Sequence, residues 1–241
     1  MKKPTFSKTI NKGDVIAVGD IHGTWDLYSE FLNWVKDSGA SVILLGDIID
    51  RGGEDLAVLD ATARLLEEPE SLGLESFSVI RGNHEQMFIE SVEGSQRDMN
   101  LWMYNGGNIF DFDEMVEKHY GWVSKLPYFI TVADTLFVHA GVQPGKSPRM
   151  TISDGKEDQL IWIREPFLKQ GPKLNKWNSV IKKVVHGHSI TFMAEGADED
   201  NPMPVVKEDR INLDTGAFLS NGRLTTYNAT QNTFHQFSRP Q

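Results

Sequence analysis

The chain has 241 residues with 39% hydrophobic and 24% charged residues, the composition of a globular protein with a substantial core. It contains no cysteine, which excludes disulfides, thiolate zinc sites and cysteine nucleophiles, and its formal net charge of −10 argues against nucleic acid as a partner. No apolar stretch is long enough for a signal peptide or a bilayer span, so we expect a cytoplasmic protein without a membrane partner.

The first third of the chain alternates between short apolar runs and helical patterns. Helices are predicted from a cap at Thr24 to an end near Gly39, and again over 54–66. Such alternation indicates parallel strands joined by crossover helices, and ligands of such sheets gather at the carboxyl ends of the strands. Three buried strands are predicted before, between and after these two helices, over 15–18, 42–45 and 77–80.

The rest of the chain changes from a helical to a strand-rich pattern. Residues 85–119 are predicted to be helical. The first two strands after them should form a hairpin, because only Ala133, Asp134 and Thr135 separate them. The strands predicted in this part are 128–132, 136–138, 180–185, 205–206, 211–213 and 224–227.

Two segments rich in glycine, proline and charge, 143–158 and 193–204, are predicted loops. No change of composition marks a boundary between domains. We therefore expect one domain over 1–241, with 1–13 as an N-terminal extension.

Five polar clusters carry the candidate chemistry, and the first three directly follow the three predicted strands of the first third. Five of the seven histidines of the chain lie inside these clusters. Isolated turns and helix caps do not explain this concentration, so we interpret the clusters as one site. They are GDIHG at 19–23, GDIIDRG at 46–52, GNHE at 82–85, HAG at 139–141 and HGH at 186–188.

Several of these residues are suitable ligands for divalent metal ions. Asp20 and His22 lie two positions apart, so in an extended chain their side chains point the same way and can form half of a site. Asp47 follows the next strand, where its two carboxylate oxygens can bridge two ions. Oxygen and imidazole ligands without sulfur suit two ions of Mn, with Fe or Zn as alternatives and Mg less favoured. The donors that can complete the second site are Asn83, His139 and His188.

Four other residues fit the hydrolysis of a phosphate ester. Two metal ions can hold a bridging hydroxide that attacks the phosphorus directly. Arg51 and Arg164 can each contact two phosphate oxygens, a geometry that guanidinium matches. His84 can protonate the departing alkoxide, and Asp50 can hold the other ring nitrogen of His84.

The order of these clusters resembles the phosphoprotein-phosphatase branch of the calcineurin-like metallophosphoesterases, from about Val15 to Gly216. RGNHEQM, the Asn105–Gly106–Gly107 break, IWIRE and INLDTGA look like the bacterial and phage protein phosphatases rather than the eukaryotic ones. The resemblance implies an α/β fold in which a central β-sandwich of mixed sheets is flanked by helices.

The resemblance also implies a role for each candidate residue. In the family the histidine ligand follows the small residue of the last cluster, which selects His188 rather than His186. One metal ion is then expected on Asp20, His22 and Asp47, and the other on Asp47, Asn83, His139 and His188. The residues expected to contact the substrate phosphate are Arg51, Asn83, His84 and Arg164.

The implied activity is that of a metal-dependent serine/threonine protein phosphatase acting on phosphoproteins or phosphopeptides, with phosphotyrosine as a further substrate. Ile190 stands where many other metallophosphoesterases have a further metal-binding histidine, which favours the phosphatase branch over nucleases and phosphodiesterases. The eukaryotic C-terminal motif is absent, so we expect a monomer without an obligate regulatory subunit.

Two alternatives remain open at this point. A symmetrical dinucleoside-polyphosphate hydrolase, acting on diadenosine tetraphosphate, uses the same metal core, although such relatives often have Gln where this chain has His22. A metal-free pseudoenzyme that only binds phosphoproteins should have lost a ligand or an arginine, and none is missing.

Overall fold

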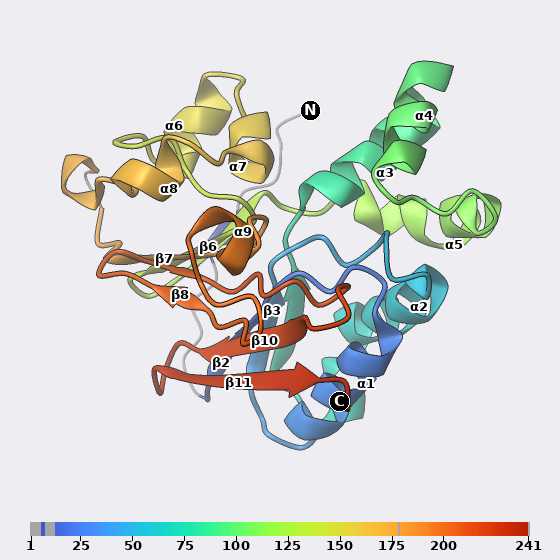
Figure 1. Cartoon of the computed structure of the whole chain (residues 1–241), viewed down its shortest axis with the longest axis horizontal. Coiled ribbons are helices and arrows are strands. Elements are labelled where there is room, and N and C mark those ends of the chain that lie inside the picture. The colour runs from blue at the N-terminus through green and yellow to red at the C-terminus, as the bar shows by residue number, and fades with distance from the viewer. Residues whose placement is uncertain (1–5, 8–12, 178, 241) are drawn as a thin grey trace.

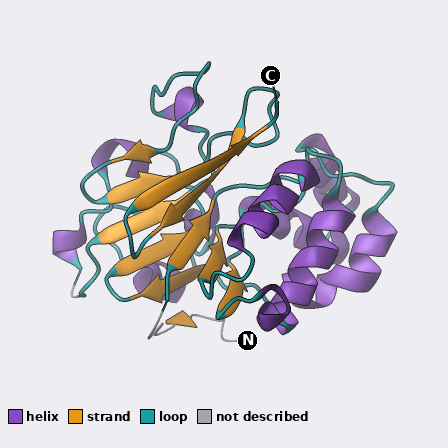
Figure 2. Ribbon diagram, turned by 90° about the horizontal axis from the view of Figure 1, so that it is seen from below, coloured by secondary structure: helices purple, strands orange, loops and turns teal. Residues whose placement is uncertain are grey.

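The structure is a computed structural model that describes residues 6–7, 13–177 and 179–240. Two β-sheets pack face to face, and groups of helices cover the outer faces of both sheets (Figure 1; Figure 2). The predicted α/β fold, a sandwich of mixed sheets flanked by helices, is confirmed. Most of the N-terminal extension predicted over 1–13 lies outside the described residues.

The five-stranded sheet contains the three strands predicted in the first third of the chain. These strands run parallel to one another, as predicted. The strand over 223–228 pairs with the first of them in antiparallel orientation. Ile16 and Val18 face the helices, whereas Val15 and Ala17 face the other sheet, so the strand is apolar at every position. The order is β11 (Thr233–Ser238), β10 (Arg223–Asn228), β2 (Val15–Val18), β3 (Ser41–Leu44) and β4 (Ser76–Val79).

The six-stranded sheet contains the strands at whose ends the polar clusters HAG and HGH lie. Its central strands β6, β7 and β9 run parallel, so that the residues following them lie at one edge. The predicted hairpin is confirmed, because β5 and β6 pair antiparallel. The order is β1 (Phe6–Ser7), β5 (Phe129–Val132), β6 (Thr135–Val138), β7 (Lys183–His186), β9 (Arg210–Asn212) and β8 (Val205–Val206).

Two helical groups cover the sandwich on opposite sides (Figure 1). The five-stranded sheet is covered by α1 (Trp25–Val35), α2 (Asp55–Glu67), α3 (Asn83–Glu93), α4 (Gln96–Tyr104) and α5 (Phe112–Val123). The six-stranded sheet is covered by α6 (Pro148–Ser153), α7 (Asp158–Trp162) and α8 (Phe167–Gln170), and α9 (Thr191–Ala194) follows β7. Short 3₁₀ turns lie at Pro69–Leu72 and Leu174–Lys176. Along the described ranges, no helix is long and apolar enough to cross a membrane.

Four predictions about the elements were wrong in detail. Thr24 precedes α1 but its hydroxyl donates to the carbonyl of Ile21 instead of capping the helix, and α1 ends at Val35, before Gly39. The predicted loop 143–158 contains α6, and the predicted loop 193–204 begins inside α9.

Two strands also differ from the prediction. The strand predicted from Val180 begins at Lys183, because Val180 is 74% exposed and finds no apolar layer to pack against. The strand β11 was not predicted, because it is an edge strand that is held by β10 and buries only Phe237, so its sequence lacks an apolar run.

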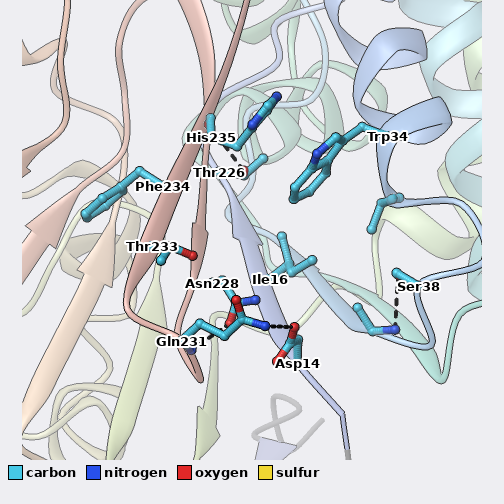
Figure 3. A pocket seen from close by; sticks show the side chains of 12 residues that line it. Asp14, Ile16, Trp34, Ser38, Thr226, Asn228, Gln231, Thr233, Phe234 and His235 are labelled. Carbon is cyan, nitrogen blue, oxygen red and sulfur yellow. Dashed lines mark hydrogen bonds between the residues drawn. The ribbon is translucent and has the colours of Figure 1, made fainter.

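A cavity of about 350 Å³ opens at the amino end of β2, between α1 and β11 (Figure 3). The rings of Trp34 and His235 stack beside it at 4.8 Å, and the amide of Gln231 donates to Asp14 Oδ2. The polar clusters follow the other end of β2, so this cavity does not belong to the candidate site.

Candidate metal centre

The five polar clusters meet around the carboxylate of Asp47. Asp47 Oδ2 lies 3.3 Å from His139 Nε2, 3.7 Å from His22 Nε2 and 3.9 Å from His84 Nε2. These residues follow β6, β2 and β4 respectively, so both sheets contribute to the cluster. The side chains of all three histidines and of Asp47 are buried. The convergence that parallel strand ends predict is therefore present.

The backbone of the site is held in a conformation that side chains rarely adopt. Five site residues other than glycine have φ between 50° and 75°, in the left-handed region. Such residues persist only where the surrounding structure holds them, and they concentrate at functional sites. They are His22, Asp47, Asp50, Arg51 and His188.

Glu85 holds the turn that carries Asp47. Its fully buried carboxylate accepts hydrogen bonds from the backbone N–H groups of Asp47 at 2.9 Å, Ile48 at 2.8 Å and Gly82 at 2.7 Å. The turn after β3 and the start of α3 are thereby fixed to each other. The sequence alone indicated only that Glu85 lies in the first turn of a helix, because these bonds join segments that are distant along the chain.

Replacing Glu85 by glutamine should lower the free energy of unfolding by about 2 kcal/mol, because an amide presents one acceptor oxygen to three buried donors. Chemical denaturation in the absence of metal measures this change. Glu90→Gln on the same helix is a suitable control, because the carboxylate of Glu90 accepts an exposed hydrogen bond from Gln86 Nε2, which lies on the same helix. Equal stability of the Glu85→Gln variant and the wild type would contradict this role.

The arrangement around His139 fits a cation. His139 Nδ1 lies 2.8 Å from the carbonyl of Leu45, so the proton on that nitrogen donates to this carbonyl. The other ring nitrogen, Nε2, then faces Asn83 Oδ1 at 3.0 Å and Asp47 Oδ2 at 3.3 Å. Burial lowers the pKa of His139, but the carboxylates of Asp47, Asp20 and Glu85 together outweigh it and raise this pKa to about 9, so without a metal ion Nε2 carries a proton at neutral pH. A divalent cation would replace this proton, and one imidazole nitrogen with two oxygen atoms is then the donor set of a metal site.

His22 presents its ring in the same way. Its Nδ1 lies 3.0 Å from the carbonyl of Ile49, so Nε2 carries the lone pair and faces Asp47 Oδ2. Burial lowers the pKa of His22 well below its ordinary value, and the nearby His84 adds to this effect, so the ring is a neutral donor. The guanidinium of Arg51 donates to His22 Nε2 at 2.7 Å.

Asp20 and His188 are joined through the backbone N–H of His188. Asp20 accepts two hydrogen bonds from the backbone N–H of His188, at 3.1 and 3.2 Å. Burial and the neighbouring Asp214 raise the pKa of Asp20. His188 Nε2 is buried without a hydrogen-bond partner among the described residues, and its ring lies 5.0 Å from that of His139. The residue before His188 must be glycine, because a Cβ at Gly187 would lie 2.0 Å from Asp20 Oδ1.

Two overlapping groups of ligand atoms result, each with all atoms within 4.8 Å of one another. One contains Asp47, His22 and His84, and the other contains Asp47, His139 and His188. Asp47 is shared, as expected of a residue that bridges two ions. The first group includes His84 rather than Asp20, because Asp20 is turned towards the backbone of His188. Nitrogen and oxygen donors without sulfur fit two divalent ions.

Asp50 and His84 form the expected pair. Asp50 Oδ2 lies 2.7 Å from His84 Nδ1, and Asp50 Oδ1 accepts a hydrogen bond from the indole of Trp102 at 3.0 Å. Burial raises the pKa of Asp50 above its ordinary value, and the hydrogen bonds from His84 and Trp102 offset only part of this rise. In the part of the chain that the structure describes, His84 Nε2 is buried without a hydrogen-bond partner, and it faces Asp47 Oδ2 at 3.9 Å.

The two arginines are exposed side chains at the rim of the cluster. The guanidinium of Arg51 lies over the ring of Phe218, 4.7 Å from its centre, which restricts its orientation. Arg164 follows α7 and lies close enough to His188 to lower the pKa of that histidine, after burial and His139. Trp162 presents its ring edge-on to His188 at 6.0 Å.

His186 does not belong to the cluster. Its ring packs against Phe167 at 4.9 Å, and burial lowers its pKa to about 4. Three neighbours of the site were not assigned a site role from the sequence: Trp102, Asp214 and Phe218. Asp214 lies in the segment INLDTGA, but the sequence of this segment does not indicate a role for its aspartate. Trp102 and Phe218 give no signal in the sequence that separates them from aromatic residues of the core.

The chain matches the model of the calcineurin-like phosphoesterase family over residues 13–215. Serine/threonine-protein phosphatase 2 of Escherichia coli (strain K12) is 39% identical over 105 residues, which cover 42% of this chain and 43% of that protein. Serine/threonine-protein phosphatase 1 of Salmonella typhimurium is 28% identical over 166 residues, which cover 65% of this chain and 71% of that protein. The match thus spans less than half the length of the Escherichia coli relative.

A solved structure described as a putative diadenosine tetraphosphatase superposes with a TM-score of 0.65 at 20% identity, covering 96% of both chains. At this identity the likeness shows a shared fold.

Proposed function

Because the chain belongs to the calcineurin-like phosphoesterase family, we propose that it is a dinuclear-metal phosphatase that hydrolyses phosphoserine and phosphothreonine in proteins. The observation that carries the proposal is the carboxylate of Asp47, which has three histidine Nε2 atoms within 4 Å. One of those histidines, His84, is in turn bonded to Asp50. A shared metal ligand thus lies beside a candidate proton donor.

The proposed metal ligands comprise two sets that share Asp47. Asp20, His22 and Asp47 would hold one ion, and Asp47, Asn83, His139 and His188 the other. When bound, two such ions would polarise the phosphoryl oxygens and supply a nucleophile from water at neutral pH. The donor atoms suit Mn, with Fe or Zn as alternatives.

The phosphate group would be oriented by residues at the rim and the floor of the site. Arg51 would contact two phosphate oxygens, and its stacking on Phe218 reduces the side-chain entropy lost on binding. Arg164 follows α7, which covers the six-stranded sheet, and would contact the phosphate from the side of His188. Asn83 would add a hydrogen bond from α3. Together they hold the ester bond in one direction relative to His84.

His84 would transfer a proton to the departing oxygen of serine or threonine. Its Nδ1 proton donates to Asp50, so the proton available for transfer is the one on Nε2, which faces Asp47. The Asp50 carboxylate stabilises the positive charge of the ring before the transfer. An alkoxide is a poor leaving group, so this proton is required for a phosphoserine substrate.

Two kinds of similarity bear on the choice of substrate. The relatives from Escherichia coli and Salmonella typhimurium carry the name serine/threonine-protein phosphatase. The solved structure named above carries the name of a diadenosine tetraphosphatase, which is the alternative function. His22, whose Nε2 lies 3.7 Å from Asp47 Oδ2, favours the protein phosphatase, because dinucleotide hydrolases often have Gln at this position.

The two functions are separated by comparing substrates at equal concentrations of Mn. We expect kcat/KM for a phosphoserine peptide to exceed that for diadenosine tetraphosphate by about tenfold or more, with a phosphotyrosine peptide between them. Release of inorganic phosphate measures the hydrolysis of the peptides. Chromatography of the nucleotide products measures the hydrolysis of diadenosine tetraphosphate. A higher kcat/KM for diadenosine tetraphosphate would overturn the proposed substrate in favour of the alternative.

A further inference from the structure

Trp102 of α4 is a fully buried residue whose polar atom reaches the candidate acid pair. The indole has one N–H donor and no acceptor. This N–H donates to Asp50 Oδ1 at 3.0 Å, across 52 positions of the chain. The partner of this buried donor is therefore the carboxylate that holds His84.

The bond to Trp102 determines how the carboxylate is oriented. Because the indole occupies Oδ1, the oxygen left for His84 Nδ1 is Oδ2, at 2.7 Å. Oδ1 must act as an acceptor towards a group that only donates, which favours the ionised carboxylate. Both oxygens are thereby fixed, and the His84 ring is held with Nε2 on the side of Asp47. Without the indole, Asp50 would be held by His84 alone and could rotate about its last torsion.

The surroundings of Trp102 hold the indole rigidly. Its ring packs against Phe88 of α3 at 6.0 Å and against Phe112 of α5 at 5.2 Å. Gly107 covers it so closely that a Cβ there would lie 2.2 Å from the indole carbon Cε2. The second glycine of the pair that interrupts the sequence after α4 is therefore required by the packing of this indole.

The same turn also contacts the arginine beside Asp50. The backbone N–H of Arg51 donates to the carbonyl of Gly106 at 3.1 Å, and Gly107 N–H donates to the carbonyl of Trp102 at the same distance. Arg51 is one of the residues with positive φ, so its backbone needs such support. The segment Trp102–Gly107 thus contacts two adjacent residues of the candidate site.

We propose that Trp102 is a positioning residue for proton transfer: its indole N–H fixes the Asp50 carboxylate and thereby directs His84 Nε2 at the leaving group. This inference rests on the proposed phosphatase function. Trp102 itself touches neither the substrate nor the proposed metal ligands. Its effect must therefore depend on how much the departing group needs a proton.

The test is Trp102→Phe, which keeps an aromatic ring in place and removes the N–H. We expect kcat for a phosphoserine peptide to fall about tenfold with KM unchanged, the loss of one hydrogen bond to a charged group. For p-nitrophenyl phosphate, whose leaving group departs without a proton, kcat should fall less than about threefold. The ratio of the two rates does not depend on the fraction of folded enzyme, so lower stability alone would not change it.

Trp122→Phe is the matched control. Its indole also donates to a buried ring nitrogen, His119 Nδ1 at 3.2 Å, but in α5 and away from Asp50. Its rate ratio should equal that of the wild type. Trp102→His, which restores a ring N–H, should give a ratio between those of the wild type and Trp102→Phe, and it also serves if the Phe variant fails to fold.

The wild type is measured first on both substrates. Absence of any hydrolysis would refute the proposed function itself. If the wild type hydrolyses both substrates, an unchanged rate ratio in Trp102→Phe overturns the role of Trp102 alone. A ratio in Trp102→His that is no closer to the wild type than that of Trp102→Phe overturns the role of the indole N–H. A ratio that changes equally in Trp122→Phe would overturn it as well.

Discussion

Replacement of Asp47 by asparagine is expected to lower kcat on a phosphoserine peptide by about 10³-fold. The physical reason is that Asp47 is the one side chain shared by both groups of ligand atoms, and an amide lacks the negative charge that holds two cations together. Loss of several kcal/mol of charge stabilisation corresponds to a rate loss of about this size. Asparagine keeps the shape of the side chain, and its oxygen can still accept the bond from the backbone N–H of His84.

The measurement combines phosphate release with the content of bound metal. After reconstitution with Mn, the wild type should retain two ions per chain and Asp47→Asn fewer than one. Asp134→Asn, at an exposed ion pair with Lys182, is the control and should behave as the wild type. Two retained ions in Asp47→Asn would refute the bridging role, and fewer than one in the wild type would support the metal-free pseudoenzyme.

Replacement of His84 by asparagine is expected to lower kcat on the same peptide by about 10²-fold or more while metal content stays unchanged. The expected size is that of general acid catalysis by one positioned side chain. Asparagine cannot carry a proton to the leaving oxygen, and Oδ2 of the buried Asp50 then loses the imidazole that it binds. The loss should be smaller on p-nitrophenyl phosphate, because its leaving group needs no proton.

His119→Asn is the matched control for this substitution. His119 is also a buried histidine near a carboxylate, Asp60 at 3.1 Å, but it lies on α5 outside the clusters. Its kcat should stay within about threefold of the wild type. A His84→Asn variant that hydrolyses the phosphoserine peptide at the wild-type rate would refute the role of acid, and one that loses metal would make His84 a ligand instead.

These two substitutions separate binding of metal from transfer of a proton, although the residues are neighbours. His84 Nε2 lies 3.9 Å from Asp47 Oδ2, close enough that geometry alone places His84 with the ligand atoms. The hydrogen bond of His84 Nδ1 to Asp50 is compatible with either role, because ligand histidines also bind carboxylates through their second nitrogen. Metal content after substitution is the measurement that decides between them.

The first half of the site could be predicted from the sequence because it depends on local patterns. Three apolar runs separated by helical patterns predict parallel strands, and parallel strands bring the residues that follow them to one edge. Asp20, Asp47 and His84 follow β2, β3 and β4 in this way, and the structure brings Asp47 and His84 together. The choice between His186 and His188 could not be made from spacing.

In an extended chain His186 and His188 would point the same way, because side chains two positions apart share a face. The positive φ of His188 breaks this alternation after β7, so that His188 joins the cluster and His186 packs against Phe167. Backbone conformations of this kind are selected by the surrounding structure and leave little trace in the residue type when the residue is not glycine.

By itself, then, the sequence determined the three parallel strands, the polar clusters at their ends and the kinds of ligand atom present. Only the tertiary structure decided which groups support them: Glu85 beneath the Asp47 turn, Trp102 behind Asp50 and Phe218 beneath Arg51. The reason is physical, because strand formation follows from the pattern of neighbouring residues, whereas these supports are single contacts between residues far apart in the chain. Such contacts exist only once the packing of helices and sheets has brought their two ends together.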